Sequence, residues 1–366
     1  MLLIGPLADP ALRLRLMPGA VPADPLTGWR LLPQPDAGIE AAAWPALVAD
    51  PQGQVAAWRG DWTPALRRYA AIFGLSPVQV AGHEVLGIAA KAPPDPAASG
   101  PGLARDWQPD LAAAMADWVL NLPDTLDAGT IRGRLPMIAA WVSARLRGDR
   151  ETADLPQIGP EGQDRLQILS RAEPYAKFFS VEELVLRQRR HRGDWSPEML
   201  RAVFVSGDAA VVLPYDPLRD RVLLIDQLRA GPVARGDRQP WFYETVAGRV
   251  DPGETPDEAA LREAVEETGL TIRRLIAGPH NYPSPGILSE YLYLYVGIAD
   301  LPDDVAGFGG LDSEDEDIRS FILPRAELTR MAMAGEIRNG PLLVLALWLE
   351  LGYARIQREL APSADG

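Results

Sequence analysis

Residues 248–270 read GRVDPGETPDEAALREAVEETGL, and this stretch decides the fold of the C-terminal half. Thr255 is a favourable N-cap, Pro256 occupies the first helical position, and Glu258 completes a Thr-x-x-Glu capping box. Gly269 stands where a helix would end in a left-handed residue. The sequence therefore predicts a loop followed by a capped helix.

The predicted helix has two unlike faces. One face is an apolar stripe, which we expect to pack on a core. Its residues are Ala260, Leu261, Ala264, Val265 and Thr268. Glu263, Glu266 and Glu267 lie three and four residues apart, so their carboxylates share the opposite face. Like charges at this spacing destabilise a helix by roughly a few tenths of a kcal/mol per pair, and Arg262 compensates them. Such a cluster beside a Gly-rich loop favours binding of hard divalent cations, typically Mg²⁺, over the alternative of a solvated acidic face.

The same stretch resembles the Nudix box, Gly-x5-Glu-x7-Arg-Glu-U-x-Glu-Glu-x-Gly-U, in which U is apolar. Every specified position is met, by Gly248, Glu254, Arg262, Glu263, Ala264, Glu266, Glu267, Gly269 and Leu270. The resemblance implies hydrolysis of a nucleoside diphosphate linked to another moiety, with two to three Mg²⁺ or Mn²⁺ ions. It implies metal ligands at Glu263, Glu267 and the Ala247 carbonyl. It also places Glu266 close by as a ligand or acid, and gives Arg262 the role of orienting the carboxylates.

The flanking sequence, from about Ser170 to Glu350, resembles ADP-ribose pyrophosphatases. In an acidic loop at residues 309–317, this resemblance implies that Glu314 is the catalytic base and Glu316 a further metal ligand. The implied substrate contacts are Phe178, Phe179, Arg201, Arg229, Glu244, Arg249, Ser284, Pro285, Gly286 and Glu290. The family's acidic neighbour of Arg201 is replaced by Ala202. Taken alone, Pro285-Gly286 could equally indicate a β-turn between strands. The acidic loop, taken alone, is more typical of a solvated surface loop.

Composition limits the classes of function. The chain has 366 residues, no cysteine and a formal net charge of −14. This length predicts two domains, and the lack of cysteine excludes disulfide bonds and thiol chemistry. The negative charge argues against nucleic acid as a partner, because sequence-independent binding relies on a positive surface. Without a membrane-length apolar run or a signal-peptide layout, we expect a cytoplasmic protein with no membrane partner.

Residues 1–150 are predicted to form an N-terminal domain with trailing helices. Short strands are expected at residues 2–4, 44–48, 54–58 and 84–88. Helices are expected at residues 63–72, 109–121 and 131–147, with a Pro-, Ala- and Gly-rich linker at 91–106. Roughly the first 90 to 100 residues resemble the γ-glutamylcyclotransferase family, which implies a small mixed β-barrel.

The functional features of that second family are altered in this chain. Ile4-Gly5-Pro6-Leu7 stands at the substrate loop but lacks its tyrosine, and Pro6 has no N–H to donate. Phe73, before Gly74, occupies the place of the catalytic glutamate, so the general base is missing. We therefore expect a structural or dimerising role for this half, and an active cyclotransferase is disfavoured.

Residues 160–356 are predicted to form the second domain, an α/β/α sandwich. Strands are expected at residues 178–187, 209–215, 221–227, 241–246, 271–276, 291–298 and 318–323. Helices are expected at Arg325–Ile337 and Pro341–Tyr353. The whole chain is thus predicted to combine an α+β N-terminal domain with an α/β C-terminal domain.

These features together predict metal-dependent hydrolysis of ADP-ribose to AMP and ribose 5-phosphate by a homodimer. One alternative is hydrolysis of another nucleoside diphosphate sugar, such as GDP-mannose or ADP-glucose. Another is a partner-binding module with incidental hydrolysis, which the intact acidic cluster disfavours because unused carboxylates repel one another. Fusions of these two halves resemble bacterial proteins associated with tellurite resistance, but no residue of this chain explains tellurite chemistry.

Overall fold

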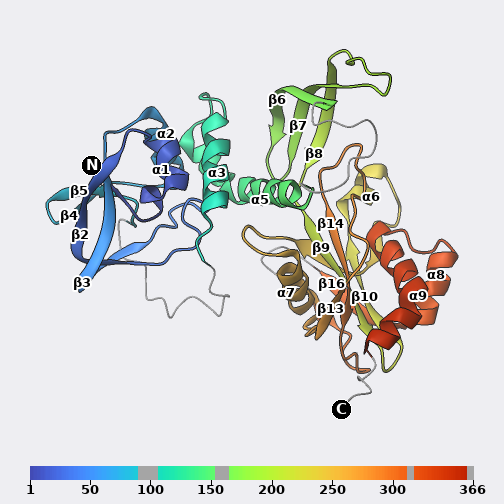
Figure 1. Ribbon diagram of the computed structural model, residues 1–366. Helices are drawn as coiled ribbons and strands as arrows, with labels where there is room; N and C mark the ends of the chain where they lie inside the picture. The colour runs from blue at the N-terminus through green and yellow to red at the C-terminus, as the bar shows by residue number, and fades with distance from the viewer. Residues whose placement is uncertain (90–105, 153–164, 311–316, 361–366) are drawn as a thin grey trace. The chain divides into compact units, whose positions relative to one another are not determined.

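The computed structural model describes residues 1–89, 106–152, 165–310 and 317–360. The chain divides into two compact units, Met1–Gly159 and Pro160–Gly366, and each is described by itself (Figure 1). Among the described residues, no helix combines the length and the apolar character needed to cross a membrane.

The described strands of the N-terminal unit form one mixed sheet with the order β2-β3-β1-β5-β4. They are β1 (Leu2–Ile4), β2 (Val21–Leu32), β3 (Ala46–Arg59), β4 (Val78–Val80) and β5 (His83–Leu86). β1 and β5 run parallel, and the other pairs are antiparallel. Within the described residues β2 and β4 do not pair with each other, so the sheet is open and the expected closed barrel is not found.

The β2–β3 hairpin departs from the sequence-based prediction. The strands expected at residues 44–48 and 54–58 are one continuous strand, β3. Its partner β2 was missed because Pro22, Pro25 and Gly28 resemble turn residues. Two register shifts in the pairing and a φ of +81° at Gly28 accommodate these residues within a strand.

Helices complete the N-terminal unit. They are the 3₁₀ helix η1 (Gly5–Ala8), α1 (Pro10–Leu16), α2 (Pro64–Phe73), α3 (Pro109–Asn121), α4 (Ala128–Gly133) and α5 (Leu135–Thr152). The prediction of α3 is confirmed. The single helix predicted at residues 131–147 is wrong, because α4 ends at Gly133 and α5 begins at Leu135. Pro136 explains the break, since proline disrupts a helix interior but is tolerated in a first turn.

Phe73 is part of the core of the N-terminal unit. Its ring is fully buried, lies 4.4 Å from the Tyr69 ring between centroids, and precedes Gly74, whose φ of +68° ends α2. The Phe73 carbonyl also accepts a hydrogen bond from the Trp44 indole N–H at 3.2 Å. Phe73, which is predicted from the sequence to stand in place of a general base, is therefore an apolar packing residue in the structure.

The C-terminal unit is built on a large mixed sheet with the order β13-β14-β9-β10-β16-β15, to which β11 adds beside β10 and β12 beside β9. The strands are β9 (Ala209–Asp216), β10 (Arg221–Leu228), β11 (Trp241–Glu244), β12 (Val246–Arg249), β13 (Arg274–Ala277), β14 (Leu292–Ile298), β15 (Phe308–Gly309) and β16 (Ile318–Pro324). The helices are α6 (Ala230–Arg235), α7 (Pro256–Thr268), α8 (Arg325–Met333) and α9 (Gly340–Leu360).

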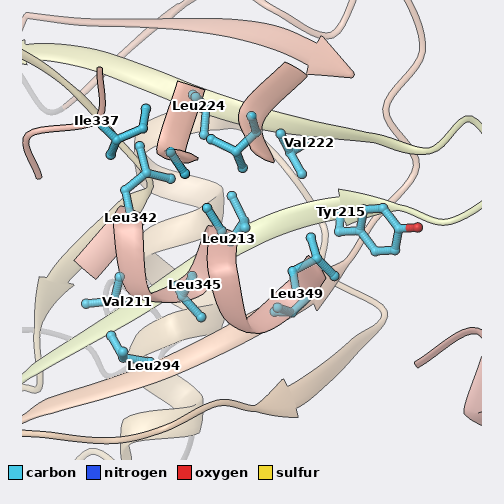
Figure 2. Close-up of a cluster of buried hydrophobic side chains, with 14 of the residues drawn as sticks. Val211, Leu213, Tyr215, Val222, Leu224, Leu294, Ile337, Leu342, Leu345 and Leu349 are labelled. Atoms are coloured by element: carbon cyan, nitrogen blue, oxygen red, sulfur yellow. The ribbon is translucent and has the colours of Figure 1, made fainter. Parts of the chain in front are cut away.

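Helices cover both faces of this sheet, because alternate residues of its central strands point to opposite sides (Figure 1). On one face, β9 and β10 pack against α9 through Val211, Leu213, Val222, Leu224, Leu342, Leu345 and Leu349 (Figure 2). On the other face, the same strands pack against α7 through Ala210, Val212, Leu223, Ile225, Ala259, Ala260 and Ala264. The α/β/α arrangement predicted from the sequence is confirmed.

A separate three-stranded antiparallel sheet precedes the large one in the chain. It consists of β6 (Leu166–Ala176), β7 (Ser180–Gln188) and β8 (Met199–Val205). Only β7 was predicted. Backbone hydrogen bonds tie β8 to the rest of the unit, from Phe204 N–H to the Ile287 carbonyl at 2.8 Å and from Ser289 N–H to the Phe204 carbonyl at 3.0 Å.

Candidate active site

The acidic helix α7 begins and ends where the sequence predicts. The Thr255 hydroxyl accepts the Glu258 N–H at 3.2 Å, and the Glu258 carboxylate accepts the Thr255 N–H at 2.8 Å, which completes the capping box. Gly269, with φ +69°, ends the helix in the left-handed conformation. Caps at both ends fix the orientation of the carboxylates between them.

The buried face of α7 differs from the predicted apolar stripe. Its buried residues are Ala259, Ala260, Ala264 and Glu267. The prediction that Leu261 and Val265 belong to the core is wrong, because their exposed fractions are 40% and 54%. Three small alanines let the helix lie close to the sheet, which leaves the bulkier side chains outside this contact.

The loop before α7 lies against the acidic face of the helix. A Cβ atom built on Gly248 would be 1.8 Å from the Glu263 Oε1, so only glycine fits while the Glu263 carboxylate keeps this position. The neighbouring Ala247 N–H donates to the Glu267 carboxylate at 3.2 Å, and Glu267 is only 2% exposed. Strand β12 thus brings the backbone of Ala247 and Gly248 to two of the predicted metal ligands.

Arg262 binds three carboxylates of the motif at once. Its guanidinium donates to Glu254 at 2.9 and 3.0 Å, to Glu263 at 2.7 Å and to Glu266 at 2.9 Å. It also donates to the Arg249 carbonyl at 2.9 Å. Burial alone would lower the pKa of Arg262, but the hydrogen bonds that it donates to Glu254 and the negative charge of Glu263 outweigh burial and raise the pKa. The predicted orienting role of Arg262 has a direct geometric basis in these contacts.

The donor set fits a hard divalent cation. The Glu267 carboxylate lies beside the Ala247 backbone, and Glu263 and Glu266 share the Arg262 guanidinium. Oxygen atoms are the ligands that Mg²⁺ prefers. Within the described residues, no three acidic or histidine side chains already converge in a metal-holding cluster. Glu314 and Glu316 lie outside the described residues.

The strand that precedes residues 311–316, β15, lies beside α7. Gly309 of β15 pairs with Ile318 of β16, and a Cβ atom on Gly309 would be 1.9 Å from the Glu267 carbonyl oxygen. The end of β15 is therefore next to the last turn of α7, and the next described strand, β16, is its neighbour in the sheet.

An aromatic cluster lies next to the same loop. Phe178 contacts Phe179, and Phe179 contacts Phe204, each with 4.7 Å between ring centroids. The Arg249 guanidinium lies 5.4 Å from the Phe178 centroid and 5.3 Å from the Phe179 centroid. Phe178 is 62% exposed, so its ring offers a free apolar surface. Such an exposed ring, flanked by arginine, suits stacking of a planar base.

The Ser284–Glu290 segment borders this cluster. Leu288 N–H donates to the Ser284 carbonyl at 3.0 Å, which closes a turn, and the adjacent Ile287 carbonyl binds β8 at Phe204. Burial raises the pKa of Glu290, and the charge of Asp208 raises it further, whereas the charges of Arg249 and Arg229 oppose the shift. Glu290 is thus near two of the predicted substrate-binding arginines.

Arg229 and Glu244 form an ion pair at the end of β10 and β11. The Arg229 Nη2 lies 2.6 Å from the Glu244 Oε2, and its Nε lies 3.0 Å from the same oxygen. Glu244 is buried, whereas the Arg229 side chain remains half exposed. The buried carboxylate therefore fixes an arginine whose outer edge faces solvent.

Arg201 is not brought to this group of residues within one chain. Its guanidinium donates to the Leu200 carbonyl at 2.9 Å and contacts the Met199 sulfur at 3.3 Å. It lies three residues before Phe204 on β8, so the two side chains point to opposite faces of the small sheet.

Phe204 and Asp208 were missed from the sequence. Phe204 contributes a ring to the aromatic cluster, and Asp208 contributes charge beside Glu290. Phe204 lies in a strand, β8, that was itself not predicted. Its apolar surroundings, Ala202, Val203 and Val205, were the available signal, since β-branched and aromatic runs indicate strands.

Comparison with known proteins agrees with this geometry. The family model described as the NUDIX domain matches residues 205–343. The ADP-ribose pyrophosphatase of Escherichia coli (strain K12) is 36% identical over 200 residues, which cover 55% of this chain and 95% of that protein. The ADP-ribose pyrophosphatase of Haemophilus influenzae is 32% identical over 206 residues, covering 56% and 94%. The GDP-mannose pyrophosphatase of Salmonella arizonae is 32% identical over 153 residues, covering 42% and 78%.

Proposed function

The chain belongs to the Nudix family of hydrolases, and we propose that its C-terminal unit hydrolyses ADP-ribose to AMP and ribose 5-phosphate. One observation carries this proposal: the acidic helix, ordered by Arg262, lies next to an exposed aromatic ring and an arginine. The acidic helix suits binding of a pyrophosphate through metal ions, and the aromatic ring with its arginine suits binding of a nucleobase. Water adds across one P–O–P bond, so each product keeps one phosphate group.

The aromatic and basic residues hold the substrate. Phe178 and Phe179 stack on the adenine, with Arg249 held against both rings. Arg229, oriented by Glu244, binds a phosphate oxygen of the substrate through its half-exposed guanidinium. Residues 284–286 and Glu290 contact the terminal ribose side of the substrate, and Arg201 makes its contact in the assembled protein.

The loop and helix hold the divalent ions that Nudix hydrolases use, here two to three Mg²⁺ or Mn²⁺. The ligands would be Glu263, Glu267, Glu316 and the Ala247 carbonyl, with Glu266 as a ligand or nearby acid. When bound there, divalent ions supply electrostatic stabilisation of the charge that develops on the pyrophosphate oxygens. Arg262 holds the carboxylates of Glu263 and Glu266 in place.

Glu314 is proposed to position the attacking water and to take its proton while the water attacks a pyrophosphate phosphorus. The position of its flanking strands supports this role. Gly309, which precedes the segment that contains Glu314, abuts the end of α7 at Glu267, and it pairs with Ile318 on the far side of that segment.

The rest of the chain is assigned supporting roles. We expect the active form to be a cytoplasmic homodimer in which exposed apolar side chains of β6 and β8, such as Leu166 and Leu200, become covered. The N-terminal unit is proposed to be a γ-glutamylcyclotransferase-like domain that has lost its activity, as in proteins associated with tellurite resistance. The buried Phe73 in place of a glutamate supports the loss of activity.

Product analysis tests the main proposal. The full chain is incubated with ADP-ribose, GDP-mannose, ADP-glucose or NADH, in Mg²⁺ or in EDTA, and AMP or GMP is quantified. We expect ADP-ribose to be the best substrate by about tenfold or more and AMP to form only with the metal. Preference for another nucleotide sugar would retain hydrolysis but refute the assigned substrate contacts. Absence of turnover with all four would refute the enzymatic assignment and favour a binding module.

A further inference from the structure

The N-terminal unit contains a cavity that is independent of the proposed hydrolase site. Its volume is about 560 Å³, which lies within the range of roughly 300–1,000 Å³ typical of small-molecule sites. It lies over the start of η1 and α1 and the ends of β2 and β3. Its main lining residues are Trp58, Trp107, Pro33, Pro35, Asp9 and Asp106.

The walls of the cavity are apolar and rigid. Five of the described lining residues are prolines, whose rings fix the backbone, and two are tryptophans. Trp58 is held by Arg13, whose guanidinium lies 3.5 Å from the ring centroid, and Trp107 is held by its indole N–H, which donates to the Ala37 carbonyl at 2.9 Å. A preformed aromatic surface reduces the entropy lost when a ligand binds.

The polar groups of the cavity are mainly acceptors. Prolines have no N–H, and the Trp107 N–H is already used. One carboxylate oxygen of Asp9 accepts the Ala11 N–H at 2.8 Å, which leaves the second oxygen available. Asp106 is exposed at the rim. No lysine or arginine belongs to the described lining, and Arg13, whose guanidinium lies over the Trp58 ring, is buried and donates to the Ala8 carbonyl.

We propose that this cavity binds a small organic cation, with an apolar body against Trp58 and Trp107 and an ammonium group at Asp9 and Asp106. Aromatic faces and carboxylates both attract a cation, and the two carboxylates outweigh the single guanidinium nearby. The same charges disfavour ligands that carry a carboxylate of their own. The site is therefore suited to amines and not to γ-glutamyl compounds.

Three probes of nearly equal shape test the charge preference. Binding of 2-phenylethylammonium, 2-phenylethanol and 3-phenylpropanoate to the full chain is measured by isothermal titration calorimetry. We expect the cation to bind at least about fivefold more tightly than the neutral alcohol, and the anion to bind most weakly. Equal affinities, preference for the anion, or no binding of the cation at millimolar concentration would each overturn the proposal.

Charge-removing variants locate the site. Asp9→Asn retains an N-cap residue for α1, and the exposed Asp106 accepts no side-chain hydrogen bond from the described residues, so Asp106→Asn removes none there. Each is expected to weaken binding of the cation about threefold to fivefold without changing binding of the alcohol. Asp61→Asn, an exposed residue of the same unit outside the cavity, is the matched control and should change neither affinity. Unchanged cation affinity in both cavity variants would refute this location of the site. If Asp9→Asn does not fold, the affinity of Asp106→Asn alone provides the test.

Discussion

Two helices of this protein, α2 and α7, have the same kinds of capping residue at their ends, but the side chains between the caps have different roles. Each begins with a threonine N-cap followed by proline, and each ends at a left-handed glycine, Gly74 or Gly269. α2 buries aromatic residues such as Phe73, whereas α7 presents carboxylates that Arg262 holds. Caps therefore determine where a helix forms, and the residues between them determine whether it packs or performs chemistry.

The largest expected effect is on turnover and comes from the acidic face of α7. Glu267→Gln keeps the size of a buried side chain and its ability to accept the Ala247 N–H but removes its charge. We expect kcat for ADP-ribose to fall by about a thousandfold or more, with an unchanged fold by circular dichroism. Asp257→Asn, in the first turn of the same helix, is the control and should retain activity. Near-normal turnover of Glu267→Gln would refute its role.

A smaller effect is expected when the arginine of each helix is removed. Arg262→Met leaves Glu254, which is buried, and Glu263 without their cation, and should lower the free energy of unfolding by about 3 kcal/mol. Arg68→Met in α2 removes a pair with the exposed Asp124 and hydrogen bonds to the Leu122 and Pro123 carbonyls, but it leaves no buried carboxylate unpaired and should cost about 1 kcal/mol. Urea denaturation of both variants measures this difference. Equal losses would show that the contacts of Arg262 contribute no more than surface contacts do.

The caps should contribute alike in the two helices. Thr255→Ala and Thr63→Ala each remove a hydroxyl that accepts a backbone N–H, from Glu258 at 3.2 Å and Leu66 at 3.0 Å. Each should lower the free energy of unfolding by about 1 kcal/mol, and serine at either position should restore most of it. Thermal denaturation compares the four variants, and a several-fold difference between the alanine variants would contradict the equivalence of the caps.

The smallest effect concerns Glu290, a carboxylate whose burial is not fully offset by arginine. Its pKa is raised in the folded protein, so its contribution to stability is present at low pH and is lost as pH rises through the folded pKa. Glu290→Gln removes the ionisable group, and with it the loss of stability that ionisation causes. The variant should therefore gain stability relative to the parent as pH increases from 4 toward 7, measured by urea denaturation at each pH. A difference that is constant with pH would refute the raised pKa.

Local signals predicted some parts of the structure well. The capping box at Thr255 and Glu258, the end of α7 at Gly269, and the boundaries of α3 follow from residues adjacent in sequence. Glu263, Glu266 and Glu267 lie on one helix, so their spacing could be predicted from the period of that helix.

Features that depend on partners distant in sequence were not predictable in the same way. Leu261 and Val265 are exposed because alanines set the distance between α7 and the sheet, which the pattern of the helix alone does not specify. Strand β2 contains prolines and glycine that resemble turns, and only its pairing with β3 keeps it extended. Phe204 joins the aromatic cluster through contacts with Phe179 and Ile287, which are distant in sequence.

The contacts of Arg262 also bear on the order of events when the enzyme matures. Because one guanidinium already neutralises part of the charge on Glu254, Glu263 and Glu266, α7 can fold before any ion arrives. Assembly of the protein and loading of its metal then become separate steps. We therefore expect a chain stripped by a chelator to keep its fold and to return to full activity when Mg²⁺ is restored.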